Sequence, residues 1–288
     1  MSAPDAYRDE LERQARTWER KPALRALYAH WFGLIAARLS PRGPSVELGC
    51  GCGALGRHLG GVIRTDNVAT PWCDMVADGK RLPFRDGSVG NVLFLDVIHH
   101  IAAPLDVLAE CQRVLRPGGR VVLLEPAISA FGRFVYGVLH HEGVDMSYDV
   151  QRPAPEDALF ANGGIPTLLF GAKPVAPRAA ASAAGTGASS DPAASASASA
   201  SAGASAGASA GASAGASWTG AAPELELVER LALTGPSYLL TGGFSYPGLL
   251  PAFAVAPLQR LEDRVVRGPL ATLLALRMLV VLERRARM

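Results

Sequence analysis

The sequence predicts an α/β fold built on a doubly wound, mostly parallel sheet. From residue 45 onward, short and uniformly apolar runs alternate with segments of helical spacing. Uniformly apolar runs are typical of strands that are covered on both faces. Their alternation with helices is typical of a parallel sheet. Hydrophobic residues make up 49% of the 288 residues, so the chain can bury a sizeable core.

The N-terminal region is predicted to be helical over residues 5–39. Leu24, Leu27, Trp31 and Ile35 recur every three or four positions and therefore share one face of a helix. The Pro- and Gly-containing segment 40–44 then ends the helix. We expect residues 1–42 to form a helical lid on the rest of the domain.

Residues 43–174 carry the main part of the predicted sheet, and a helix is predicted at Pro104–Leu115. The predicted strands are Ser45–Leu48, Val62–Thr65, Asn91–Leu95 and Arg120–Leu124.

Residues 175–222 are almost wholly Ala, Ser, Gly and Pro, and the second half repeats Gly-Ala-Ser-Ala. Such residues bury too little apolar surface to offset the entropy of ordering, so we predict a disordered insert. Residues 223–288 then complete the same domain. The predicted elements there are a strand at Leu225–Val228, a Gly-rich turn region at Tyr238–Tyr246, a helix at Pro257–Val266 and a final strand at Arg277–Leu282.

Charge and apolar patterning exclude several classes of protein. The net charge is +2 and no run of basic residues is present, which argues against a nucleic-acid partner. The apolar stretch Leu270–Leu282 contains Arg277 and is shorter than the roughly 20 residues of a membrane span, so no stable membrane insertion is expected. Residues 1–20 lack an apolar signal core, and no C-x-x-C pair is present. We therefore expect a cytoplasmic protein without a metal.

The strongest local motif is the glycine-rich segment 46–56. A predicted strand enters it, and Gly49, Gly51 and Gly53 allow a tight turn and the close approach of a ligand. Part of the motif also fits the dinucleotide pattern, so an NAD-dependent oxidoreductase is one alternative. Glu47 argues against it, because a carboxylate near the turn disfavours a pyrophosphate and favours a cationic ligand such as S-adenosylmethionine (SAM).

Two further carboxylates follow short apolar runs. Asp66 ends the second predicted strand, where it can accept hydrogen bonds from both hydroxyls of a ribose. Asp78, followed by Gly79, can accept a hydrogen bond from an adenine amino group. The alternative for either aspartate is an ordinary turn or cap.

Together with the segments Asp96–His100 and Arg113–Arg120, these motifs make residues 43–126 resemble the class I SAM-dependent methyltransferases, most closely their small-molecule "type 11" subgroup. The resemblance implies a Rossmann-like, seven-stranded sheet with a final antiparallel strand, and SAM as the cofactor. Asp96 and Val97 are implied to face the methionine end of the cofactor. The residues implied to line the rest of the site are Glu47, Gly49, Gly51, Asp66 and Asp78.

The short spacing between Asp66 and Asp78 departs from the pattern of that family. Only about 11 residues separate the two aspartates, so the usual helix between these strands is expected to be short or absent.

Methyl transfer from a sulfonium needs mainly positioning, and it needs a base only if the nucleophile arrives protonated. His99 and His100 follow the strand at Asn91–Leu95, so they are the candidate catalytic residues, with a packed or capping histidine as the alternative. The candidate substrate-binding residues are Tyr136, His140 and His141. Aromatic residues favour an apolar or aromatic small substrate; they are Trp31, Phe131, Phe134, Tyr136 and Tyr148.

The predicted function is therefore methyl transfer from SAM to an unidentified small molecule. A non-catalytic SAM-binding interaction protein, with the insert as a tether, is the main alternative. An NAD-dependent oxidoreductase is weaker, because it leaves Glu47 and the Arg-Pro-Gly-Gly turn at 116–119 unexplained.

Overall fold

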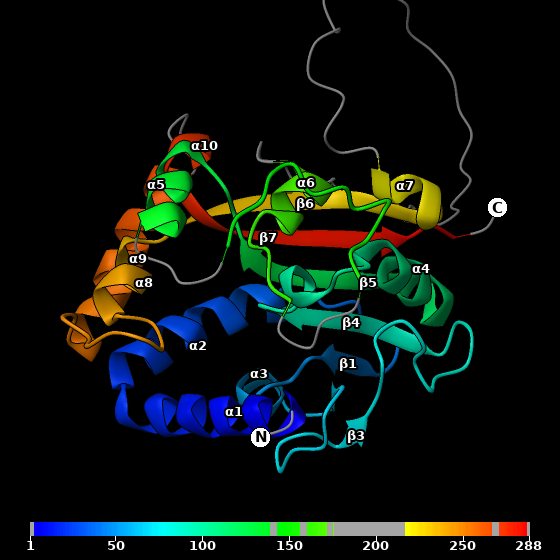
Figure 1. Ribbon diagram of the computed structural model, residues 1–288, viewed down its shortest axis with the longest axis horizontal. Helices are drawn as coiled ribbons and strands as arrows, with labels where there is room; N and C mark the ends of the chain where they lie inside the picture. Colours follow the sequence, from blue (N-terminus) through cyan, green and yellow to red (C-terminus); the bar gives the residue numbers. More distant parts are fainter. Residues whose placement is uncertain are drawn as a thin grey trace, which may run out of the picture.

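A central sheet with helices on both faces organises the protein (Figure 1). The computed structural model describes residues 3–138, 143–155, 160–171, 175, 217–266 and 271–286. The strands within this part of the chain are β1 (Ser45–Leu48), β2 (Val62–Asp66), β3 (Met75–Val76), β4 (Val89–Leu95), β5 (Leu115–Pro126), β6 (Leu225–Thr234) and β7 (Ala275–Arg284).

The sheet has the order β3-β2-β1-β4-β5-β7-β6. Neighbouring strands from β3 to β5 are parallel, whereas β7 runs antiparallel to both β5 and β6. The predicted fold class is thus confirmed, including the final antiparallel strand. Because Leu48 is in register with Thr65 of β2 and Phe94 of β4, the carboxyl ends of these strands meet at one edge.

The helices follow the predicted alternation with the strands. They are α1 (Ala3–Arg20), α2 (Pro22–Ala36), α3 (Ala54–Leu59), the 3-10 turn η1 (Ile98–His100), α4 (Pro104–Val114), α5 (Ala130–Val138), α6 (Ile165–Phe170), α7 (Ser217–Ala221), α8 (Pro236–Thr241), α9 (Ala252–Val266) and α10 (Ala271–Leu274).

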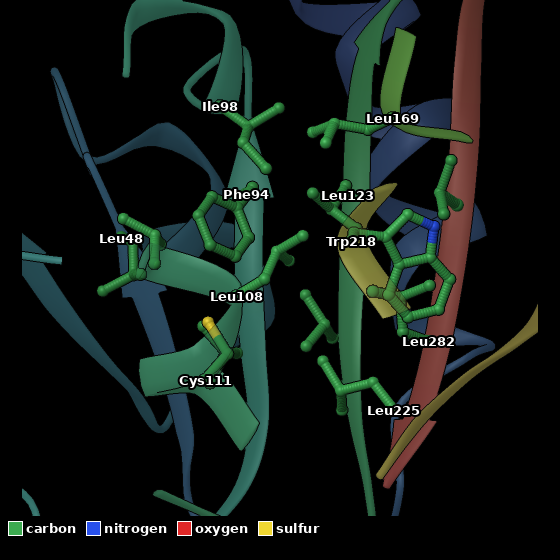
Figure 2. Packing of buried hydrophobic residues seen from close by; sticks show 14 of the residues in the cluster. Leu48, Phe94, Ile98, Leu108, Cys111, Leu123, Leu169, Trp218, Leu225 and Leu282 are labelled. Carbon is green, nitrogen blue, oxygen red and sulfur yellow. The ribbon is translucent and has the colours of Figure 1, made fainter. Parts of the chain in front are cut away.

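Side chains that alternate along the strands build two cores on opposite faces of the sheet. On one face, Leu93 and Val122 pack against α2, α3 and α9. On the other, Phe94 and Leu123 pack against α4, α6 and α7, where Leu108, Leu169 and Trp218 close the layer (Figure 2). Strands covered on both faces explain why the sequence of each reads as a continuous apolar run.

Three connecting segments of the chain can be compared with their sequence-based predictions. No helix lies between β2 and β3, as the short spacing predicts. The predicted turn region at 238–246 is instead helical at its start, where α8 runs to Thr241. Most of the predicted insert lies outside the described residues, but its last part was assigned wrongly, because 217–221 form α7 and Trp218 is buried against Phe170.

Within the ranges that the structure describes, no helix is both long enough and apolar enough to cross a bilayer.

Candidate active site

The glycine-rich loop joins β1 to α3 at the carboxyl edge of the sheet. Gly49, Gly51 and Gly53 have φ values of +62°, +52° and +70°, the left-handed region that favours glycine. A Cβ on Gly49 would lie 2.8 Å from both methyl groups of Val97, the second residue after the end of β4. The loop therefore has the shape that the motif predicts, and it packs directly against the next strand of the site.

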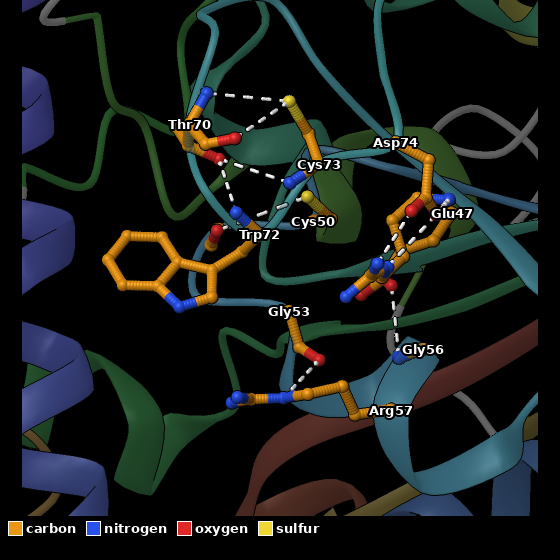
Figure 3. Close-up of polar contacts among 11 residues, drawn as sticks. Glu47, Cys50, Gly53, Gly56, Arg57, Thr70, Trp72, Cys73 and Asp74 are labelled. Atoms are coloured by element: carbon orange, nitrogen blue, oxygen red, sulfur yellow. Dashed lines mark hydrogen bonds and ion pairs between the residues drawn. The ribbon is translucent and has the colours of Figure 1, made fainter.

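Glu47 is turned away from the open side of this loop. Alternation along β1 directs its side chain toward α3, where the carboxylate accepts a hydrogen bond from the Gly56 N–H at 3.1 Å (Figure 3). Burial raises the pKa of Glu47 to about 8, although the Gly56 N–H and Arg64 oppose the rise. A carboxyl that is mostly protonated at neutral pH attracts a sulfonium only weakly. The Glu47 carboxylate thus anchors α3, and the cofactor-binding role of Glu47 stays a prediction.

Arg57 and Trp72 hold the outer side of the loop (Figure 3). The Arg57 guanidinium donates to the carbonyl oxygens of Gly53 and Cys52, each at 3.1 Å. A Cβ on Gly53 would lie 3.1 Å from the Cβ of Trp72. Burial also raises the pKa of the Cys50 thiol, which favours a filling role for this side chain over a reactive one.

Asp66 lies at the end of β2 and joins the glycine loop to the lid. One carboxylate oxygen accepts the Gly51 N–H at 3.1 Å. The Tyr7 hydroxyl of α1 lies 3.4 Å from both carboxylate oxygens. Leu11 of the same helix covers Gly51, since a Cβ there would lie 3.7 Å from its Cδ2. Helix α1 thus covers the carboxylate that was predicted to bind a ribose, and burial raises the pKa of Asp66.

Asp78 lies in an exposed turn after β3. Its carboxylate accepts the Lys80 N–H at 2.9 Å, and its carbonyl accepts the Arg81 N–H at 2.9 Å. This is the turn geometry that the sequence left open as the alternative, and Gly79 lies within it. An adenine-binding role for Asp78 and Gly79 stays a prediction.

Asp96 follows β4 and has a φ of +58°, the sole non-glycine residue with positive φ in the described ranges. Such a conformation costs energy and is held by its surroundings. The carboxylate is ion-paired with Arg277 of β7 and lies 3.5 Å from the Tyr28 hydroxyl. Asp96 therefore meets Val97 and Gly49 on one side and the helical layer on the other.

Arg277 is a site residue to which the sequence analysis assigned no role. It is 3% exposed, and its guanidinium carbon lies 4.8 Å from the centre of the Trp31 ring and 5.5 Å from that of Tyr238. The available signal was an arginine inside an otherwise apolar strand, which marks a paired charge rather than a core position.

His99 and Glu125 form a buried dyad at the ends of β4 and β5. His99 Nδ1 lies 2.6 Å from a carboxylate oxygen of Glu125. The other oxygen of Glu125 accepts the N–H groups of Val97 and Ile98, at 2.8 and 2.9 Å. Glu125 therefore holds both the ring and the turn that carries it. His100 is exposed instead, and its Nδ1 lies 3.3 Å from the Phe160 carbonyl.

Asp96, His99 and Glu125 offer ligand atoms that lie within 4.8 Å of one another, close enough to hold a metal ion. The carboxylate of Asp96 is ion-paired with Arg277, and Glu125 binds two backbone N–H groups besides the imidazole. Each of the three residues thus already has a partner within the protein, and the expectation that no metal is used stays a prediction.

The predicted substrate-binding residues do not converge on one described site. Tyr136 is buried and donates its hydroxyl to the Leu276 carbonyl at 2.7 Å, and the substrate role predicted for it stays a prediction. His140 and His141 lie outside the described residues. The five aromatic residues separate as well: Trp31 belongs to the core beneath α2, Phe131 and Tyr136 to a cluster around α5, Tyr148 to the opposite core, and Phe134 is exposed.

Residues 46–123 match the family of the methyltransferase domain. The match spans β1 to β5, with the glycine loop, Asp66 and Asp96 inside it. Together with the sheet order and the site at its carboxyl edge, it defines a class I SAM-dependent methyltransferase domain. The cofactor of this domain is SAM.

Relatives of known sequence share the same region. The chain is 43% identical to an uncharacterized 37.1 kDa protein in transposon TN4556 of Streptomyces fradiae, over 22% of this chain and 18% of that one. It is 41% identical to an uncharacterized methyltransferase of Mycolicibacterium gilvum, over 23% and 27%. It is 31% identical to a demethylmenaquinone methyltransferase of Streptomyces griseus, over 39% and 50%. The chain thus spans half or less of the length of these relatives.

Proposed function

We propose that the protein transfers a methyl group from SAM to a small molecule at the carboxyl edge of β1, β4 and β5. The observation that carries this proposal is the pairing of Asp66 with the glycine loop through the Gly51 N–H, inside a segment that matches the methyltransferase domain. Because the Glu47 carboxylate accepts a hydrogen bond from the Gly56 N–H, Glu47 no longer argues against an NAD-dependent oxidoreductase. The match to the methyltransferase domain favours a methyltransferase instead.

The residues present fit the cofactor. Three glycines in the left-handed region form a tight turn that packs so closely on Val97 that a Cβ on Gly49 would clash with it. Asp66 supplies a carboxylate for the ribose hydroxyls once Tyr7 leaves it. Asp96, whose side chain is 28% exposed, supplies a negative charge for the cationic end of the cofactor. When bound, SAM supplies an activated methyl group on a sulfonium.

The His99–Glu125 dyad is the proposed base. The Glu125 carboxylate accepts a hydrogen bond from the Nδ1–H of His99. This bond fixes the tautomer and leaves Nε2 as the nitrogen that takes a proton. An acceptor that arrives protonated must lose its proton when it takes the methyl group from the sulfonium, and Nε2 of His99 would take that proton. His100 lies at the exposed end of η1 and is proposed as a contact of the acceptor.

Binding and transfer measurements separate these two roles. Calorimetric titration should show binding of SAM and none of NAD. Asp66→Asn should weaken SAM binding about tenfold or more, because hydrogen bonds to a charged group contribute about 1.5–3 kcal/mol. His99→Gln should leave SAM affinity within about twofold and slow the transfer of labelled methyl to small molecules of a cell extract by about a hundredfold.

Asp86→Asn is the matched control, since Asp86 is an exposed carboxylate paired with Arg113 away from the loop. NAD binding without SAM binding would reject the proposal. SAM binding with no transfer in any fraction of the extract would favour the non-catalytic alternative.

A further inference from the structure

Large apolar side chains are exposed around the turn that joins α8 to α9, which lies at the left-hand margin of Figure 1. Leu249 and Phe253 are 80% and 83% exposed, and Leu240 and Tyr246 are exposed as well. The Leu249 N–H donates to the Leu240 carbonyl at 2.8 Å, which brings these two residues together. Residues 231–259 contain no charged side chain. The four residues thus form an uncharged surface, here called the apolar tip.

The turn that carries the apolar tip is fixed to the rest of the protein. The Lys21 ammonium binds backbone carbonyl oxygens along the turn, from Thr241 to Tyr246. Phe244 fills the inner side of the turn, where its ring stacks on that of Trp18 with 6.5 Å between the centroids. The apolar tip is therefore left on the outer side of an ordered turn, and its exposure does not come from a loose chain.

Two exposed arginines lie behind the apolar tip on the same face of α9. With 3.6 residues per turn, Phe253, Arg260 and Arg264 lie within about 40° of one another around the helix. The rise of about 1.5 Å per residue places the two arginines about 10 and 16 Å behind Phe253 along the helix axis. Both arginines are exposed. The face of α9 that begins with the apolar tip is thus basic further along.

Acidic groups near this surface are few in the described part of the chain. Helices α2 and α8, which pack against α9, contain no acidic residue. On α9 itself Glu262 is buried and Asp263 is half-buried. At the end of α1, the exposed Glu19 is followed by Arg20 and Lys21. The surroundings of the apolar tip therefore have a positive charge.

We propose that the apolar tip docks the protein on the surface of an anionic lipid bilayer. Apolar side chains of peripheral proteins enter a bilayer to a depth of about 5–10 Å, and basic side chains behind them meet the negatively charged headgroups. The spacing of about 10 Å between Phe253 and Arg260 fits this arrangement, with α9 directed away from the bilayer. The contact is peripheral and involves no membrane-spanning segment.

The chemistry of the apolar tip favours lipid over a protein partner. Protein interfaces contain about one hydrogen bond per 100–200 Å². Among the four side chains of the tip, only that of Tyr246 can form a hydrogen bond, and tyrosine is itself enriched where a membrane meets water. The backbone carbonyls of the turn are bound by Lys21.

Docking in this way would bring the carboxyl edge of the sheet close to the bilayer. Strands β5 and β6 are both antiparallel to β7, so they are parallel to each other. Helix α8 follows β6 and therefore begins at the same edge as the candidate active site. The inference goes beyond the proposed function and does not rest on it, because docking requires neither SAM nor methyl transfer.

Flotation of the full-length protein with lipid vesicles tests the docking. The protein should bind vesicles of phosphatidylcholine with about 30% phosphatidylglycerol at least about tenfold more tightly than vesicles of phosphatidylcholine alone. Leu249→Ser combined with Phe253→Ser should weaken binding to the anionic vesicles about tenfold or more, because less apolar surface enters the bilayer. Arg260→Gln combined with Arg264→Gln should reduce the preference for anionic vesicles to less than about threefold.

Met75→Ser combined with Val76→Ser is the matched control, because these two residues are exposed apolar residues of β3, at the opposite edge of the sheet. This variant should bind the vesicles as the unchanged protein does. Leu249→Trp gives a second measurement that keeps an apolar side chain in the tip. Compared with the unchanged protein, its fluorescence should shift to shorter wavelength when anionic vesicles are added.

Three outcomes would overturn the inference. They are no binding to anionic vesicles, undiminished binding after the Leu249 and Phe253 substitutions, and no wavelength shift in Leu249→Trp. A dimer in sedimentation that the Leu249 and Phe253 substitutions abolish, without vesicle binding, would assign the apolar tip to a second copy of the chain instead. None of these results bears on SAM binding, so the proposed function is tested separately.

Discussion

At the scale of single residues, burial changes what a carboxyl group can do. Glu47 and Asp66 both lie near the glycine loop and both are almost fully buried. Glu47 accepts one backbone N–H and has a pKa of about 8, so its charge is largely suppressed at neutral pH. Asp66 accepts the Gly51 N–H and a tyrosine hydroxyl, which oppose the effect of burial on its pKa. The two residues look alike in the sequence and differ in chemistry because of their partners.

Glu47→Gln tests this difference through the pH dependence of stability. The folded state holds the Glu47 proton up to about pH 8, whereas the unfolded chain releases it near the ordinary value of 4.5. This contribution is therefore fully present below pH 4.5 and is lost as the pH rises through 8, by about 1.4 kcal/mol per pH unit. Gln keeps the acceptor for Gly56 without titrating. The Tm of the variant minus the Tm of the unchanged protein should therefore increase from pH 5 to pH 8.

Glu12→Gln serves as the control, because Glu12 is an exposed residue of α1 paired with Arg16. A constant difference in Tm between the Glu47 variant and the unchanged protein across this pH range would contradict the buried, protonated state.

At the scale of elements, α1 behaves as a lid on the cofactor site. Its residues are mostly polar, and Leu11 and Trp18 are its buried apolar side chains among those described. The junction with α2 is better anchored, because the Lys21 ammonium is bound by the carbonyl oxygens of Thr241, Gly242, Gly243 and Tyr246. A weakly packed helix on a fixed junction can move as a unit, and the proposed binding of SAM at Asp66 would require such a movement.

Tyr7→Phe tests the lid. The phenylalanine keeps the packing of the ring but lacks the hydroxyl that bonds Asp66. Losing this competitor should tighten SAM binding, by up to about tenfold for a bond of about 1.4 kcal/mol. Calorimetry measures the change, with Tyr246→Phe, an exposed tyrosine, as the control. Weaker SAM binding in Tyr7→Phe would mean that the hydroxyl contacts the cofactor and does not compete with it.

At the scale of the whole molecule, a low-complexity stretch separates two parts of one sheet. The antiparallel strand β7 inserts between β5 and β6, so the region after the stretch supplies the last two strands. After this stretch, Trp218 is the first described residue whose side chain belongs to the hydrophobic core, where it packs with α4 and Phe170. The stretch before it has a composition that supplies no large apolar side chain.

Deletion of residues 182–209 should therefore leave the Tm unchanged or slightly raised, because shortening a loop to about a third of its length changes the free energy of closure by only about 1 kcal/mol. A deletion that extends through residue 221 removes Trp218 and should cost about 3–5 kcal/mol. Thermal unfolding of the two variants measures both effects. A large drop in Tm for the shorter deletion would show that this stretch supports the fold.

The fold was predictable to a large extent because burial on both faces leaves a local trace. The predicted strands at Asn91–Leu95 and Arg120–Leu124 are mostly apolar, and the glycines at 49, 51 and 53 mark a turn that an L-residue disfavours. The boundary at Ser217 was missed, because a single Trp in a polar stretch is a weak signal for a buried helix.

The candidate site was also predictable only in part. The positions of Asp66, Asp96 and His99 at the carboxyl edge were predictable because each residue follows or ends a strand. The partners were not found: Tyr7, Glu125 and Arg277 reach the edge from elements that are far apart in the chain. Local pattern therefore determined the sheet, the loop and the position of the site. Tertiary structure alone decided the hydrogen-bond partner of each carboxyl, the helix that covers Asp66 and the cation that pairs with Asp96, because burial and pairing depend on neighbours that the sequence does not place side by side.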